Sequence, residues 1–174
     1  AREQARLARA ERDKARQVNA FLQDMLAAAD PADLGRNATV AQVLDRAQQR
    51  AERELAADPD MLAPTELTLS RTYAALGDLD AAVRTARIGL QAAQRLGTPG
   101  ALFDARFALG SALVSHGDYA QAADELAQAR TLAVDGGTAL QRGSVAHQFG
   151  ILENARGNAA QALRWHETAL AELP

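Results

Sequence analysis

The 174-residue sequence contains no cysteine, and only 4% of its residues are aromatic. Without cysteine the chain can form no disulfide bond and no thiolate metal site, although this absence does not identify the compartment. Aromatic and β-branched residues are too few and too scattered to build a sheet. No stretch approaches the roughly twenty apolar residues that a membrane-spanning helix needs, and no signal peptide is visible.

Positive charge comes almost entirely from arginine, since Lys14 is the only lysine. The net charge of −3 argues against binding to nucleic acid. The charge is unevenly distributed, because residues 1–17 carry six basic and three acidic side chains, which leaves −6 for residues 18–174.

Alanine is what the sequence has in abundance, at about a quarter of all residues, and 48% of the residues are hydrophobic. Alanine is the strongest helix former and costs no side-chain entropy on folding. This composition favours closely packed helices, so the sequence predicts an all-α fold.

Three segments align without gaps at a spacing of 40 residues, at 69–90, 109–130 and 149–170. Each contains a glycine followed by an acidic or amide residue: Gly77-Asp78, Gly117-Asp118 and Gly157-Asn158. Glycine can adopt the left-handed conformation that ends one helix, and Asp or Asn can cap the next. These pairs therefore predict short turns between antiparallel helices.

Eight helices follow from these turns and from the positions of the proline residues. Asp58-Pro59 is expected to end the second helix, and Pro64 is expected to lie in the first turn of the third. The predicted helices are 2–29, 39–57, 61–76, 79–96, 99–116, 119–134, 139–156 and 159–172.

Small residues recur at fixed distances from each turn glycine and should allow two helix backbones to approach closely. They are Ser70, Gly110 and Gly150 before the turn, and Ala82, Ala122, Ala162, Gly89, Ala129 and Ala169 after it. We expect Ala122 and Ala162 to be buried at helix contacts. Ala81 and Ala160 should lie away from these contacts.

Two charged residues interrupt the apolar positions of the repeat. Glu153 stands where the first copy has Tyr73, and Arg130 stands where it has Leu90. These charged side chains should face solvent or pair with each other. Trp165 should fill the space between repeats.

The repeated pattern resembles the tetratricopeptide (TPR) family, in which pairs of helices stack into a superhelix. The resemblance covers roughly residues 60–174, with a period of 40 where the family has about 34. It implies a TPR-like helical-hairpin solenoid of three repeats, preceded by a charged connector helix and a degenerate half-repeat. The expected segments are 1–30 (connector), 31–59 (half-repeat), and 60–97, 98–137 and 138–174 (the repeats, together 60–174).

In this family the first helix of each pair lines a concave surface that binds other polypeptides. The resemblance places there Pro64, Leu67, Arg71 and Ala74; Asp104, Phe107, Ser111 and Val114; and Ser144, His147, Ile151 and Asn154. We expect this face to bind a protein or peptide ligand, unless residues 1–30 or a neighbouring subunit cover it. The face lacks the Lys and Asn pattern of receptors for chaperone tails.

The segments ARQVNAFLQDMLAAADP (15–31) and TVAQVLDRAQQRAERELAADP (39–59) carry a second resemblance. They are similar to the region after the membrane helix in bacterial serine/threonine protein kinases with C-terminal TPR arrays. This implies an extracytoplasmic sensor or scaffold, excised from a larger protein and joined to a membrane only through a segment outside this chain. Two alternatives remain open: a cytoplasmic effector-binding domain of a bacterial transcription activator, and a structural oligomerisation scaffold.

Nothing in the sequence predicts an active site, a cofactor or a metal centre, so we expect the chain itself not to be an enzyme. His116, His147 and His166 are too far apart for a local metal signature. The last predicted helix carries Leu163 and Leu170 with too little chain after it to cover them. Because a solenoid repeat buries its apolar face only against the next repeat, we expect self-association or further repeats in the parent protein.

Overall fold

The structure is a computed structural model, and it describes residues 12–13, 16–21, 23 and 39–172. Seven helices run through the last of these ranges: α3 (Val40–Glu54), α4 (Pro59–Ala75), α5 (Leu79–Leu96), α6 (Pro99–His116), α7 (Tyr119–Gly136), α8 (Ala139–Ala155) and α9 (Ala159–Glu172). The described residues between 12 and 23 are helical as well, and no strand occurs in the described part of the chain. The predicted all-α fold of about eight helices is confirmed. The rest of the predicted helix 2–29, and residues 30–38, lie outside the described residues.

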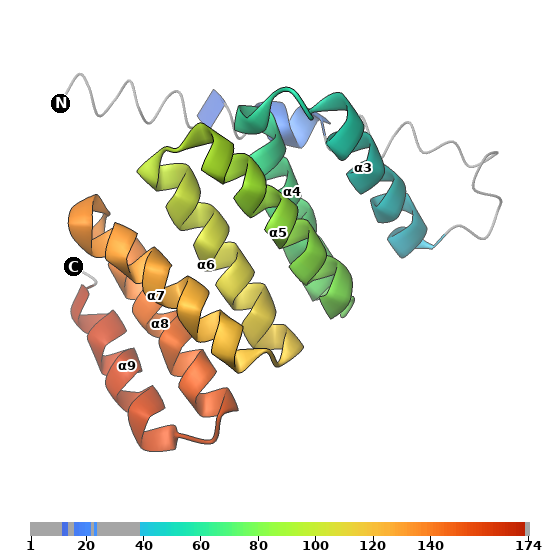
Figure 1. The fold of residues 1–174 in the computed structure, drawn as a ribbon. Coiled ribbons are helices and arrows are strands. Elements are labelled where there is room, and N and C mark those ends of the chain that lie inside the picture. Colours follow the sequence, from blue (N-terminus) through green and yellow to red (C-terminus); the bar gives the residue numbers. More distant parts are fainter. Residues whose placement is uncertain (1–11, 14–15, 22, 24–38, 173–174) are drawn as a thin grey trace.

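The helices pack as sequential antiparallel hairpins, and Figure 1 shows them as one row from green to red. α4 pairs with α5, α6 with α7, and α8 with α9. α4, α6 and α8 also contact one another in order, so they form one layer. α5 packs on α6 as α7 packs on α8, which joins successive hairpins into a helical repeat array.

The turn inside each hairpin has the same backbone geometry in all three repeats. Its glycine adopts a positive φ, of 83° at Gly77, 99° at Gly117 and 82° at Gly157. The N–H of the next residue donates to the carbonyl five positions earlier, at 3.0 Å from Asp78, 3.0 Å from Asp118 and 2.8 Å from Asn158. This bond satisfies a carbonyl that the helix end leaves without a partner. The predicted helix–helix turns are thereby confirmed.

The predicted side-chain caps of these turns are confirmed only in part. The Asp78 carboxylate accepts from the Ala81 N–H at 2.9 Å and caps α5. Asp118 makes no cap bond to α7, because its carboxylate binds His116. The Asn158 side chain donates backwards to Glu153 at 2.7 Å.

Two prolines near the start of α4 differ from their predicted places, because α4 begins two residues earlier than expected. α3 ends at Glu54, and Pro59 is the first residue of α4 rather than the end of α3. Its missing N–H costs nothing there, and Asp58 caps the helix by accepting from the Met61 N–H at 3.2 Å. Pro64 therefore lies inside α4, not in its first turn.

Within two of the hairpins, a glycine on the first helix receives a large side chain from the second. A Cβ on Gly110 would lie 2.8 Å from the Leu126 side chain, and one on Gly150 would clash with the His166 ring. Neither position can therefore carry a larger residue without moving its neighbour.

The first hairpin fills the equivalent space between its two helices with different residues. Ser70 stands at the glycine position, and Ala86 stands where the later repeats have a large side chain. Both residues are buried, and the Ser70 hydroxyl donates to the Ala82 carbonyl at 2.7 Å. A larger residue on one helix is thus matched by a smaller one on the other.

The small residues after the turn glycines are buried as expected at Ala122 and Ala162, and Ala160 is exposed. The expectation for Ala81 is wrong, because this residue belongs to the main core cluster. The repeat pattern does not predict the burial of Ala81, because the equivalent residue of the second repeat, Gln121, is exposed.

The segments before α4 are tied to α4 and α5 by several contacts. Tyr73 of α4 donates its hydroxyl proton to Asp45 of α3 at 2.8 Å. Arg95 of α5 donates to the Ala56 carbonyl, after α3, at 2.8 Å. Val18 is buried, and Phe21 packs against the main core cluster. Part of the predicted connector therefore covers the core of the array.

Replacing Ala122 by leucine should overpack the second hairpin, because the side chain at this position has no solvent-exposed surface. We expect a loss of roughly 1–3 kcal/mol in the free energy of unfolding. Ala160→Gln, on an exposed site, should change it by less than about 0.5 kcal/mol. Urea unfolding followed by circular dichroism measures both, and equal midpoints for the two variants would contradict the packing.

Candidate functional site

The residues predicted to line a binding face differ in exposure. Leu67 is buried, because it packs against Gly89 of α5, where a Cβ would lie 2.6 Å from its side chain. Val114 is buried in the same core cluster. Pro64 and Ala74 are half-buried. Leu67 of α4 and Val114 of α6 therefore contribute to the core and offer no surface to a ligand.

The middle of the predicted face is partly closed. Phe107 of α6 is half-buried and stacks on Phe103, with ring centroids 5.9 Å apart. Ser111 is also half-buried, and its hydroxyl donates to the Phe107 carbonyl at 2.8 Å. Arg71 and Asp104 remain exposed on either side.

The third repeat presents the most open part of the predicted face, on α8. His147, Ile151 and Asn154 are exposed, and Ser144 is half-buried. The same spacing of three and four residues extends to Leu140, which is 67% exposed, while Ile151 is 38% exposed. We call Leu140, Ser144, His147, Ile151 and Asn154 the α8 stripe. Sequence reasoning missed Leu140, although one more step of the spacing would have found it.

One side of the α8 stripe meets the last helix. The rings of His147 and His166 lie 5.1 Å apart, and the His166 ring also packs against Gly150. Sequence reasoning did not bring these two histidines together. The described residues hold no group of three or more His, Cys, Asp or Glu side chains that could bind a metal ion.

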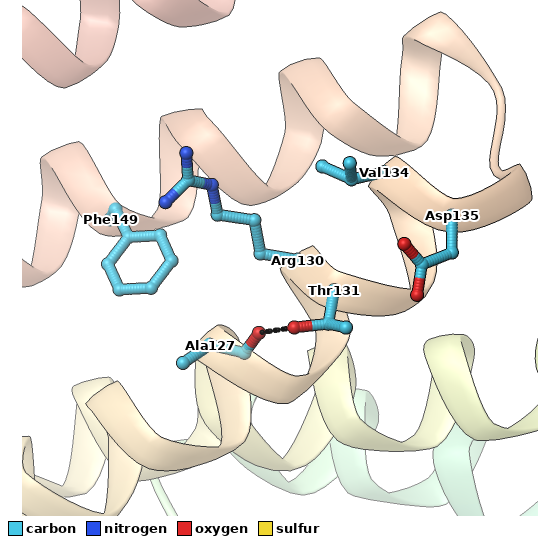
Figure 2. Close-up of a pocket in the computed structure, with 6 residues that line it drawn as sticks. All are labelled: Ala127, Arg130, Thr131, Val134, Asp135 and Phe149. Atoms are coloured by element: carbon cyan, nitrogen blue, oxygen red, sulfur yellow. Dashed lines mark hydrogen bonds between the residues drawn. The ribbon is translucent and has the colours of Figure 1, made fainter.

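A second candidate surface is a groove of about 410 Å³ between α7 and α8. We call it the α7–α8 groove. Figure 2 shows its lining residues: Ala127, Arg130, Thr131, Val134 and Asp135 of α7, and Phe149 of α8. The Arg130 side chain points toward α8 and away from the Asp135 carboxylate. The groove is thus lined by both apolar and charged groups.

The groove exists because Arg130 replaces an apolar residue of the repeat. At the preceding junction, Leu90 of α5 and Leu109 of α6 are both buried. At this junction the equivalent residues are Arg130 and Phe149, and both are at least partly exposed. The charged guanidinium cannot fill the apolar space that a leucine would fill.

An aromatic pair positions the Arg130 side chain. Trp165 of α9 stacks on Phe149, with ring centroids 4.7 Å apart, and the Arg130 guanidinium lies 5.2 Å from the Trp165 centroid. This distance allows a cation–π attraction. The alternative prediction of an Arg130–Glu153 pair is wrong, because Glu153 binds Arg156 at 2.9 Å instead.

The last helix carries two leucines whose exposure is unusual for their position. Leu163 and Leu170 of α9 are 60% and 70% exposed. Their equivalents in the first repeat, Val83 and Leu90, are buried between hairpins. Leu163 and Leu170 therefore occupy the positions at which the first hairpin packs against the next one, but in α9 they are exposed.

A buried carboxyl group lies on α4 and was missed from the sequence. Glu66 is fully buried, and neither of its oxygens has a hydrogen-bond partner among the described residues. Burial, with a smaller contribution from the charge of Glu52, raises the pKa of Glu66 to about 8. The group is therefore mostly neutral at pH 7, which avoids an unpaired charge in the interior. No repeat pattern marks it, since the equivalent residues are Arg106 and Ala146.

Glu66 should make the stability of the protein depend on pH. Its raised pKa means that the folded chain holds a proton between about pH 4.5 and pH 8 that the unfolded chain releases. The free energy of unfolding should thus fall by up to about 1.4 kcal/mol per pH unit in this window. Glu66→Gln should remove this slope and be more stable than the parent above pH 8. Parallel profiles from chemical unfolding between pH 5 and pH 9 would contradict the assignment.

His116 joins the turns of two neighbouring repeats. Its Nε2 lies 3.0 Å from the Asp80 carboxylate of α5, and its Nδ1 lies 3.0 Å from Asp118. The hydrogen bond to Asp80 is the main cause that raises the pKa of His116 above its usual value, with Asp118 adding to it. When it is protonated, the imidazole can donate to both carboxylates.

The bridge at His116 should be present at low pH and be lost as the pH rises through the raised pKa of His116. We expect an NMR titration to show this pKa above the usual value of about 6.5. Asp80→Asn should lower it, whereas Asp124→Asn, at an exposed carboxylate of α7, should leave it unchanged. An identical His116 titration in the Asp80→Asn variant would rule out the bridge in solution.

Comparisons with protein-family models and with curated proteins give no match to this chain. Among the described residues, no helix is both long enough and apolar enough to span a membrane. The repeat array and its exposed surfaces are therefore the basis for a functional proposal.

Proposed function

We propose that this chain is a non-catalytic TPR-type module that binds a protein or peptide through the α8 stripe. The observation that carries the proposal is the exposure of Leu140 and Ile151 on one line of α8. The two residues are eleven positions apart, or about 16 Å along the helix. A peptide of several residues could span this length and bury both side chains.

The chemistry of the α8 stripe suits recognition of a polypeptide. Between the two aliphatic residues lie His147 and Ser144, and Asn154 lies beyond Ile151. Hydroxyl, amide and imidazole groups can each donate to or accept from a peptide backbone. The aliphatic side chains can bury apolar ligand surface, and the neighbouring polar groups can pair with the ligand backbone.

We also propose a wider role, as the sensor or scaffold region of a bacterial serine/threonine protein kinase on the extracytoplasmic side of the membrane. The support is the residue pattern at 39–59, which includes α3 and the cap of α4. Reading the parent gene upstream of residue 1 tests this role. Kinase motifs followed by a transmembrane segment would support it, and a DNA-binding domain there would contradict it.

Peptides selected from a random phage-displayed library against this chain should bind the α8 stripe. We expect Ile151→Asp and Leu140→Asp to weaken the selected peptides at least tenfold in fluorescence anisotropy, because each variant places a charge on an apolar anchor. Leu163→Asp, at a similarly exposed leucine of α9, is the matched control and should leave the affinity unchanged.

An unchanged affinity in Ile151→Asp would contradict the proposed site.

Light scattering on the same three variants tests the self-association that the exposed face of α9 makes possible. If that face joins two chains, Leu163→Asp alone should lower the molar mass. If the parent chain is monomeric, the exposed face of α9 is not an interface for self-association.

A further inference from the structure

We propose that the α7–α8 groove is a second peptide site, which takes a segment with an acidic side chain beside an apolar one. The groove shares no lining residue with the α8 stripe. The inference therefore does not depend on the function proposed above.

The acidic requirement comes from Arg130. Within the described residues, no carboxylate lies at salt-bridge distance from its guanidinium, which is instead held over the Trp165 ring. The stacked Phe149 and Trp165 rings give the guanidinium a fixed support on one side. Its N–H groups remain available to a ligand carboxylate, which arginine can bind through two parallel hydrogen bonds.

The apolar requirement comes from the walls of the groove. Phe149 is partly exposed on the α8 side, and Ala127 and Val134 lie on the α7 side, with Val134 61% exposed. A ligand that brings only a carboxylate would leave these walls in contact with water. An aliphatic side chain next to the carboxylate would cover them and add hydrophobic affinity.

Asp135 limits the ligand further. It lies five residues after Arg130 on α7, or about 7.5 Å along the helix axis. Five residues also rotate the helix by about 140°, and the Arg130 side chain points away from the Asp135 carboxylate, so this rise does not measure the distance between the two charges. A basic residue of the ligand that follows its acidic and apolar residues would face Asp135.

The test uses acetylated and amidated Leu-Glu-Leu-Lys, with Leu-Gln-Leu-Lys as the uncharged control. Because Trp165 is the only tryptophan of the chain, its fluorescence should change when a carboxylate binds the guanidinium that lies over its ring. We expect isothermal titration calorimetry to show at least tenfold weaker binding of the control peptide. Binding of the acidic peptide should also weaken as salt is raised.

Arg130→Leu is the decisive variant, because it restores the residue type that seals the first junction at Leu90. It should fold, with a melting temperature no lower than that of the parent, and should weaken the acidic peptide at least tenfold. Arg84→Leu, at an exposed arginine of α5, should leave the affinity unchanged.

Three outcomes would overturn the proposal: no binding of the acidic peptide, equal binding of both peptides, or unchanged affinity in Arg130→Leu. The Ile151→Asp variant separates the two sites. If it abolishes binding of the acidic peptide while Arg130→Leu does not, the peptide occupies the α8 stripe and the groove is not a site.

Discussion

The close approach of the two helices in each hairpin governs how the array is built. At Gly110 and Gly150 the first helix has no side chain, so that Leu126 and His166 of the second helix can pack against its backbone. The first hairpin reaches the same result with Ser70 opposite a smaller partner. Since this contact fixes the rotation of both helices, it also determines which residues of α8 face solvent and where Trp165 of α9 lies.

The turns and the periodicity could be predicted because they depend on local chemistry. A glycine with positive φ, followed by a backbone hydrogen bond to the preceding helix, is set by a few adjacent residues. Burial depends instead on the neighbouring helix. Leu67 was placed on an exposed face by its spacing, yet Gly89 lets α5 come close enough to bury it. Pro64 lies beyond the first turn because Asp58 caps α4 so that the helix begins at Pro59, two residues before the predicted start.

The candidate surfaces were predictable to different degrees. His147 and Ile151 were identified from spacing, and Arg130 stood out as a departure from the repeat, but the groove beside it could not be foreseen. Its walls come from both α7 and α8, and the direction of the Arg130 side chain depends on the stacked rings of Phe149 and Trp165, which belong to α8 and α9. The burial of Glu66 could not be predicted from the sequence, because it depends on how the surrounding helices pack around the carboxyl group.

The unequal junctions between hairpins have a consequence for the cooperativity of unfolding. In a linear array, each unit is stabilised by its own contacts and by the interface with its neighbour. Buried leucines seal the first junction, whereas the second contains a groove and a guanidinium, and the far side of α9 leaves two leucines exposed. The coupling free energy is therefore smallest at the C-terminal hairpin. We expect the amide hydrogens of α8 and α9 to exchange with solvent through an opening of this hairpin alone, while the first two hairpins exchange together.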